Sequence, residues 1–587
     1  MEPQAGCENE AEYTAALSNQ RVSSIERQNN GIRFSISDLA PPTARVLPTV
    51  YSSREDIGLY DAQFDPDTGE RIPIPEFVIC AVVVTILRFQ VVCADHGVPN
   101  TRIRILATEA TRTAVNSEEF RKSIYNATGL STEMLPKEEE GLVGAWGIAS
   151  GFSEVEGILL DLGGGSIQIS WMIFRGGEIE MSPRGPLSFP YGAAALTRTL
   201  KVLEDGKTKA EAARAVAEFR REVKASFLQA YGELQIPFSM YDNARMEGGF
   251  PLYLSGGGFR GWGYLILSRN QQGGHHYPIS IINGYTAGKD EFRDTEALKH
   301  TAKSAQKIFR VSDRRRAQVP AVAFLIDVLA ESIPNGIRNV HFCQGGVREG
   351  VLFQTLNNEV RKQDPLEVAT TVFARPSTEA LFYLLKTFIP ASTQDSQLIF
   401  PTSINDHQIR AFINALYVHA PMGKESASTS ALYSTSTGIL SAAHGISHKD
   451  RALLALMLEE RYEGDLPPRE VEFKESLRRL LTREEIWWTR YLGAVGELIA
   501  AIYPAGVIDM AKPRIIASSR WSNSMGKNRN ELGINLTITV PKDQDRRMRL
   551  KDTVQQYTND IMRVGRKKHW IGEEPKWGIK VDVGVID

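Results

Sequence analysis

The stretch from Gly157 to Met172 constrains the fold of this chain more than any other. It contains an apolar strand, a turn of three glycines and a second alternating strand, and Asp161 stands where the first strand should end. Glycine lets backbone N–H groups converge on phosphate oxygens, and a carboxylate beside them can hold Mg²⁺ through water. A hairpin with a glycine-rich turn and no ligand is the alternative, because such a turn is a weak motif alone.

Two further glycine clusters also follow apolar strands. Gly256, Gly257 and Gly258 come after the strand at 252–254, and Gly345-Gly346 comes after the strand at 340–342. Helical patterns separate these strands, which indicates an α/β architecture up to about residue 356. Three such turns are expected where several strand ends converge on one phosphate-bearing ligand.

The composition is that of an ordinary globular protein. The net charge of −2 argues against binding of nucleic acid or of a membrane through a general basic surface. The four cysteines lack metal-type spacing, and we therefore expect a reducing, cytoplasmic location. The most apolar run, Phe77 to Cys93, is interrupted by Arg88 and Gln90 and is shorter than the roughly 20 residues of a membrane span. It predicts a buried helix.

Changes of pattern along the chain divide it into segments. Residues 1–28 are polar and are expected to be an irregular extension, whereas helical patterns dominate residues 357–505. Strand patterns return at Leu532–Val540 and Trp577–Val585, with a charged helix between them, and predict a small α+β domain over residues 506–587.

Four motifs then occur in a characteristic order: Ala-Thr-Glu-Ala-Thr-Arg at 107–112, Glu-Glu-Glu-Gly-Leu at 138–142, Asp-Leu-Gly-Gly-Gly-Ser at 161–166 and Gly-Gly-Val-Arg-Glu-Gly at 345–350. Together they resemble the exopolyphosphatase/guanosine pentaphosphate phosphohydrolase (Ppx/GppA) family over roughly residues 30–356. The segment at 30–37 and the long C-terminal extension resemble its fungal branch, which is associated with mitochondria-to-nucleus retrograde signalling.

The resemblance implies an actin/sugar-kinase-like fold, in which two ribonuclease-H-like lobes hold the ligand in the cleft between them. These lobes would span residues 29–145 and 146–356, and the helical part would be related to HD phosphohydrolase domains. It also assigns roles to single residues. Glu140 would activate the attacking water, and Asp161 would hold Mg²⁺. The expected ligand-binding residues are Asn30, Arg112, Asn116, Gly163, Gly164, Gly165, Ser166, Gly256, Gly257 and Gly258.

The first phosphate loop departs from the family pattern. Where the family has Asp, an apolar residue, Gly, Ser and Asn, this chain has Glu26-Arg27-Gln28-Asn29-Asn30. Gln28 adds a side chain where backbone must approach phosphate, so half of the expected phosphate clamp is altered.

Other polar residues have simpler interpretations. Adjacent His275 and His276 point to opposite faces of an extended segment and cannot readily share one ion. His407, His419, His444 and His448 lie in the HD-like region, but no His-Asp dipeptide occurs, and we expect no metal there. Arg348 is expected to pair with Glu349 at a helix start rather than to bind phosphate.

Two functions remain open at this point. The resemblance favours a regulatory protein that binds a nucleotide or polyphosphate and relieves an inhibitory protein partner in retrograde signalling. The alternative is a Mg²⁺-dependent phosphohydrolase acting on polyphosphate or on guanosine penta- or tetraphosphate, because Glu140 and Asp161 are retained. A homodimer is left open, and neither a membrane nor a nucleic acid is an expected partner.

Overall fold

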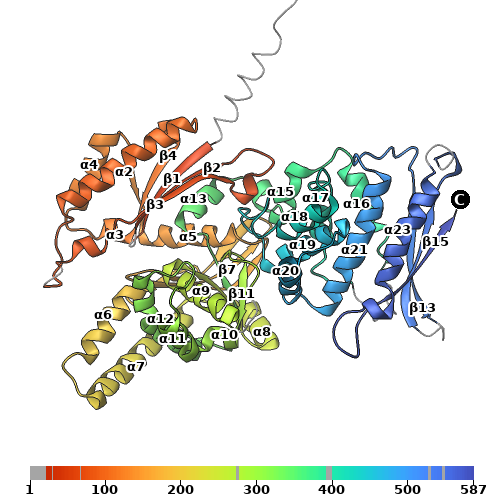
Figure 1. The fold of residues 1–587 in the computed structure, drawn as a ribbon. Coiled ribbons are helices and arrows are strands. Elements are labelled where there is room, and N and C mark those ends of the chain that lie inside the picture. The colour runs from red at the N-terminus through yellow and green to blue at the C-terminus, as the bar shows by residue number, and fades with distance from the viewer. Residues whose placement is uncertain are drawn as a thin grey trace, which may run out of the picture. The chain divides into compact units, whose positions relative to one another are not determined.

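The fold is described from a computed structural model that covers residues 21–28, 31–65, 68–272, 277–391, 400–526, 531–544 and 549–586 (Figure 1). The chain divides into two compact units. The first comprises residues 1–274, 282–363 and 443–445, and the second comprises residues 275–281, 364–442 and 446–587. His275 and His276 fall outside the described residues.

The first lobe of unit 1 is a five-stranded sheet flanked by helices. Its strand order is β3-β2-β1-β4-β5, in which β1, β2 and β3 are antiparallel neighbours whereas β4 and β5 run parallel to β1. The elements are β1 (Arg21–Gln28), β2 (Gly31–Asp38), β3 (Thr49–Glu55), α2 (Glu76–Asp95), β4 (Ile103–Ala107), α3 (Glu109–Arg112), α4 (Ser117–Thr128), β5 (Thr132–Met134) and α5 (Lys137–Ala149).

The second lobe repeats this arrangement. Its main sheet has the order β11-β12-β10-β6-β7-β8, with β6, β7 and β8 antiparallel and with β10 and β12 parallel to β6. The strands are β6 (Val155–Leu162), β7 (Ile167–Arg175), β8 (Glu178–Met181), β9 (Leu187–Phe189), β10 (Phe250–Ser255), β11 (Tyr285–Gly288) and β12 (Ile337–Phe342). The helices are α6 (Ala193–Glu204), α7 (Lys209–Glu233), α8 (Phe238–Glu247), α9 (Gly256–Gln272), α10 (Lys289–Arg293), α11 (Thr295–Ser304), α12 (Asp313–Ser332), α13 (Val347–Thr355) and α14 (Asn358–Arg361). The two sheets share one strand order and one pattern of antiparallel and parallel pairs, which confirms the predicted α/β class.

The structure corrects the prediction that residues 1–28 form an irregular extension. Strand β1 begins at Arg21 and lies in the middle of the first sheet, antiparallel to β2 and parallel to β4. Its sequence lacks an alternating apolar pattern, so the pattern did not predict a strand. The segment is extended because it exchanges hydrogen bonds with two neighbouring strands.

Helix α2 covers one face of the first sheet. Val78, Val82 and Phe89 are buried among β2 residues, and the rings of Phe89 and Phe34 lie 4.7 Å apart. Each such side chain contributes roughly 1.5–3 kcal/mol on full burial. The helix is long and apolar enough to cross a membrane, a weak indication because core helices of soluble proteins share these properties. The predicted helix is present, but only one of its faces is buried.

Unit 2 consists of a helical region followed by a three-stranded sheet. Its helices are α15 (Pro365–Thr370), α16 (Thr378–Lys386), α17 (Asp406–Ala415), α18 (Lys424–Tyr433), α19 (His448–Tyr462), α20 (Pro468–Arg478) and α21 (Arg483–Ile502). The sheet has the order β13 (Ile516–Met525), β14 (Glu531–Thr539) and β15 (Lys580–Ile586). Strands β14 and β15 are parallel, and α23 (Leu550–Val564) connects them and packs on β15.

Helices α5 and α13 pass each other with backbone against backbone. A Cβ atom placed on Gly350 would lie 1.9 Å from the carbonyl oxygen of Val143, and one on Gly345 would lie 1.9 Å from that of Gly147. No side chain fits between these segments. Glycine is therefore required here by close approach of the two backbones.

We expect Gly350→Ala to lower the free energy of unfolding of the chain by about 2–4 kcal/mol, because the added methyl group meets a carbonyl oxygen that cannot move aside as a side chain would. Chemical denaturation followed by circular dichroism measures this. Gly232→Ala in α7 is the matched control, since nothing lies within 4 Å of its added Cβ. Equal stability of the two variants would contradict the prediction.

Candidate functional site

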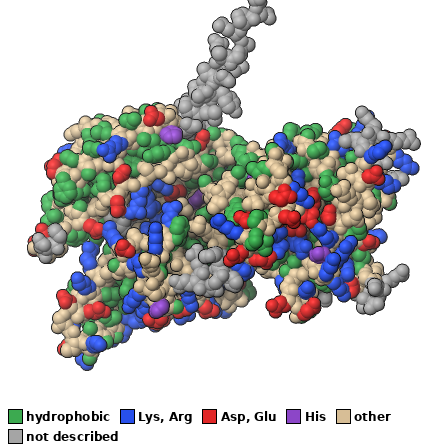
Figure 2. Space-filling model, in the orientation of Figure 1, with side chains coloured by type: hydrophobic (Ala, Val, Ile, Leu, Met, Phe, Trp, Pro, Cys, Tyr) green, Lys and Arg blue, Asp and Glu red, His purple; other side chains and the backbone are tan. Residues whose placement is uncertain are grey.

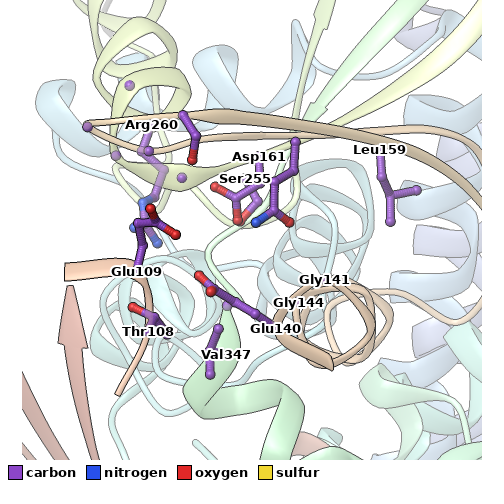
Figure 3. A pocket seen from close by; sticks show the side chains of 18 of the residues that line it. Thr108, Glu109, Glu140, Gly141, Gly144, Leu159, Asp161, Ser255, Arg260 and Val347 are labelled. Carbon is purple, nitrogen blue, oxygen red and sulfur yellow. The ribbon is translucent and has the colours of Figure 1, made fainter. Parts of the chain in front are cut away.

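Both lobes of unit 1 contribute side chains to one cavity (Figure 3). The first lobe supplies residues from β2, β3, the start of α3 and α5. The second lobe supplies the ends of β6 and β10 with the starts of α9, α12 and α13. Of the predicted site residues, the structure brings Glu140, Asp161, Gly163, Gly164, Ser166, Gly256, Gly257 and Gly258 to this cavity.

The β6–β7 turn is oriented by the helix that follows it. The carbonyl oxygens of residues 163–165 accept hydrogen bonds from the amides of residues 192–195, at the start of α6, over 2.9 to 3.3 Å. These peptides are trans, so each N–H points opposite to its carbonyl. The N–H groups of Gly164, Gly165 and Ser166 therefore point away from α6. Three successive amides oriented in this way form an anion-binding concavity.

Asp161 lies at the end of β6 beside the start of α9. A Cβ atom on Gly256 would lie 2.5 Å from Oδ1 of Asp161 and 2.3 Å from the carbonyl oxygen of Leu162. Gly256 also has a φ of +88°, which disfavours any side chain. Gly256, which the sequence predicts to lie in a turn, is thus the first residue of α9. Because it has no side chain, α9 can begin next to the Asp161 carboxylate.

Glu140 occupies the first turn of α5 and points into the cavity (Figure 3). Its Oε2 accepts a hydrogen bond from the Arg112 guanidinium at 3.1 Å, and Arg112 also pairs with Glu109 at 2.7 Å. Burial raises the pKa of Glu140 to about 7, against the opposing effect of Arg112 and with smaller contributions from Asp161 and Glu109. A carboxyl with this pKa can accept a proton near neutral pH.

Two arginines of the first lobe lie opposite each other. Arg33 on β2 and Arg54 on β3 are paired in the antiparallel register, and both line the cavity. Like charges directly opposite on neighbouring strands destabilise a sheet. Arg54 also pairs with Asp56 at 3.3 Å, and an anion between the two arginines would offset their mutual repulsion further.

The second lobe supplies two more arginines, Arg260 from α9 and Arg315 from α12. Among the described residues neither forms a salt bridge. Arg260 donates to the carbonyl of Gln344 and Arg315 to that of Arg310. Burial, followed by repulsion from Arg260 and Arg54, lowers the pKa of Arg315 to about 10. Figure 2 shows Lys and Arg side chains gathered where the lobes of unit 1 face each other.

Three predicted residues do not line the cavity, and one is not described. Asn116 both accepts from the amide and donates to the carbonyl of Ile74, so it anchors the segment before α2 instead of the ligand. Arg112 acts through Glu140 and Glu109. Gly165 does not line the cavity, and only the direction of its N–H group bears on the site.

Asn30 lies outside the described residues. The neighbouring Gly31, whose added Cβ would meet the Glu55 carbonyl at 2.7 Å, lines this edge of the cavity.

The cavity arginines were missed by the sequence reasoning. Arg315 lies in an Arg-Arg-Arg run at 314–316, of which Arg314 pairs with Asp61 and Arg316 binds backbone carbonyls. Charge runs usually indicate a solvated helix face, and only the fold shows which member of the run faces inward.

The predicted pairing of Arg348 with Glu349 is confirmed at 2.5 Å. Burial alone would raise the pKa of Glu349, but Arg348 outweighs it and lowers this pKa to about 2. The four histidines expected to bind no metal have separate contacts: His407 binds Glu367, His419 packs on Tyr462, His444 binds Ser150 and His448 binds Tyr277. Among the described residues the only trio with metal-type spacing is Glu463, Glu497 and Asp560.

The donor set of the cavity fits Mg²⁺. Asp161, Glu140 and Glu109 supply carboxylate oxygens, and Thr108 and Ser166 supply hydroxyls. These are hard oxygen ligands of the kind that Mg²⁺ prefers, and they need not converge tightly because Mg²⁺ keeps several waters and binds substrate phosphate. Asp161 would hold such an ion, with Glu140 as a second carboxylate.

Sequence comparison relates the chain to known proteins in two parts. Residues 40–250 match the model of the Ppx/GppA phosphatase family, and residues 364–587 match that of the RTG2 C-terminal domain. The chain is also similar to Retrograde regulation protein 2 of Saccharomyces cerevisiae. The two are 38% identical over 510 residues, which cover 84% of this chain and 83% of the yeast protein.

Structure comparison finds more distant likenesses. The Ppx/GppA phosphatase of Aquifex aeolicus, in its type II variant, is 20% identical and covers 58% of this chain and 100% of its own, with a TM-score of 0.41. An exopolyphosphatase from Cytophaga hutchinsonii is 16% identical and covers 58% of this chain and 99% of its own, also with a TM-score of 0.41.

We expect Glu140→Gln to stabilise the protein at high pH only. The folded-state pKa of about 7 lies above the ordinary value of 4.5, so ionisation of Glu140 costs the folded state stability as the pH rises from 4.5 through 7. The neutral amide avoids this cost, which amounts to about 3 kcal/mol above pH 7. Urea unfolding at pH 5 and pH 8 measures the difference.

Glu139→Gln is the matched control, because this neighbouring side chain in the same helical turn is exposed. The interpretation of Glu140 is wrong if the two variants show the same dependence of stability on pH.

Proposed function

Because the chain belongs to the Ppx/GppA phosphatase family, we propose that the cavity of unit 1 binds a phosphate-bearing anion, a nucleotide or a polyphosphate, and that the chain is a regulator of retrograde signalling. The bound anion would set the form in which the chain acts on an inhibitory protein partner in the cytoplasm. The likeness to the yeast retrograde regulation protein over 84% of the chain supports the signalling role.

The observation that carries this proposal is the concentration of positive charge opposite the oriented amides. Arg33, Arg54, Arg260 and Arg315 line the same cavity as the glycine turn at 163–166. Burial of Arg315, and then repulsion from Arg260 and Arg54, lowers its pKa, so holding this guanidinium in the cavity costs free energy. A polyanion removes this repulsion, and bidentate hydrogen bonds from arginine match phosphate oxygens well.

A second candidate function is phosphohydrolysis, and Glu140 favours it. A general base is most effective when its pKa lies near the working pH, and the pKa of Glu140 is about 7. Mg²⁺ held at Asp161 would supply charge neutralisation for the transferred phosphoryl group. Glu140 would then accept the proton of the attacking water, while the arginines orient the phosphate chain.

The binding proposal predicts that tripolyphosphate raises the melting temperature of the protein and that Arg315→Ala weakens its binding by roughly 10- to 100-fold. This is the loss expected when one charge-assisted contact, worth about 1.5–3 kcal/mol, is removed. Isothermal titration calorimetry measures the affinity.

Arg314→Ala is the control for the same experiment, since Arg314 is the preceding residue of α12 but pairs with Asp61 and does not line the cavity. Unchanged affinity in Arg315→Ala, or an equal loss in both variants, would count against the cavity as the anion site.

Opposite pH dependences separate the two functions. Ionisation of Glu140 adds negative charge to the cavity, so the wild type should lose affinity for tripolyphosphate relative to Glu140→Gln as the pH rises through about 7. Hydrolysis that uses Glu140 as the base should instead rise through the same range and fall by 10²- to 10⁴-fold in Glu140→Gln. Phosphate release with Mg²⁺ between pH 5.5 and 8.5 tests this, and equal release by wild type and variant excludes Glu140 as the base.

A further inference from the structure

Helix α2 carries a second apolar face that unit 1 leaves exposed. Phe77 is 75% exposed, Val84 44%, Leu87 40% and Val91 62%. Cys80 and Ala94 are exposed on the same side. The opposite face, with Val78, Val82 and Phe89, is already buried in the core of the lobe.

Such a face is unusual for a surface helix. Surface helices normally present charged and polar residues to water, and a helix that is apolar all round is covered on all sides. Between Phe77 and Ala94 the exposed residues include a single charged one, Arg88. A contiguous apolar strip of this kind marks an interaction surface.

The spacing of the strip indicates what covers it. Positions 77, 80, 84, 87, 91 and 94 are separated alternately by three and four residues, which is the a/d repeat of a coiled-coil seam. The seam is complementary to itself when a second copy runs antiparallel. Phe77 then faces Ala94 of the second copy, Cys80 faces Val91 and Val84 faces Leu87. At each end of the strip the large Phe77 meets the small Ala94, and in the middle Val84 and Leu87 are similar in size.

We propose that α2 is a homodimerisation surface, on which α2 of a second copy of this chain packs antiparallel about a two-fold axis between Val84 and Leu87. A two-fold interface uses the same patch on both subunits, so it requires a self-complementary surface of this kind. Antiparallel packing also places the positive end of each helix dipole near the negative end of the other.

The charges around the strip disfavour an anionic membrane as the occupant. The exposed charged residues of α2 and the adjacent α4 are four acidic and two basic: Glu76, Asp95, Glu118 and Glu119 against Arg88 and Lys122. Helices that lie on membranes instead carry a basic polar face that binds anionic lipids.

The strip is about 25 Å long, from the rise of a helix over 17 residues. One helix pair of this length buries less than a standard interface, so we expect a dimer that dissociates in the micromolar range. The residues of α2 do not line the cavity, and the proposal stands apart from the proposed anion binding.

Sedimentation equilibrium of the full chain between about 1 and 100 µM tests the proposal. We expect reversible dimerisation in the wild type and at least a tenfold weaker dimer in Val84→Glu. Val202→Glu is the matched control, because Val202 is 70% exposed on α6. A wild type that stays monomeric, or a Val84→Glu variant that dimerises as tightly as Val202→Glu, overturns the proposal.

Cross-linking tests the register even if Val84→Glu is poorly folded. In a Cys7→Ser background, Val91→Cys should give a disulfide-linked dimer with the native Cys80 on mild oxidation. Leu87→Cys should not, because it lies about one helical turn from Cys80 in this register. Cross-linking of both variants or of neither contradicts the register. Flotation of monomeric protein with anionic vesicles would show a membrane surface instead and would overturn the proposal.

Discussion

The hydrogen bonds between the first amides of α6 and the carbonyls of the β6–β7 turn determine what the cavity of unit 1 can bind. They orient the peptide planes of residues 163–165, so that the following amides point away from α6. A helix N-terminus would otherwise bind an anion itself. Here its first amides bond to the carbonyls of the turn, and the N–H groups of residues 164–166 face away from α6 beside Asp161.

The cavity of unit 1 is lined by charged side chains of both signs. Positive charge from four arginines is concentrated there, and so is negative charge from Asp161, Glu140 and Glu109. Arg112 partly neutralises the carboxylates, yet Glu140 still has a raised pKa. A phosphate-bearing ligand with Mg²⁺ would bring a negative group to the arginines and a positive one to the carboxylates at once.

The sequence predicted those parts of the fold that are encoded locally. The α2 and α4 helices and the strand–glycine–strand unit around Asp161 follow from periodicity and from the conformational freedom of glycine. Strand β1 was missed because it is extended only through its two neighbours in the sheet. The arginines of the site were missed for a related reason. Arg315 and Arg316 are adjacent and chemically alike, and only packing separates the one that faces the cavity from the one that binds backbone.

The contact of α5 with α13 has a mechanical consequence. Because the backbones touch at Gly147 and Gly345, with no compressible layer of side chains between them, the two segments cannot move closer. A second close contact, between Gly350 and Val143, holds the same pair of segments about one helical turn away. Glu140 precedes Val143 by only three residues, so the turn of α5 that carries its carboxylate is held at a fixed height above α13.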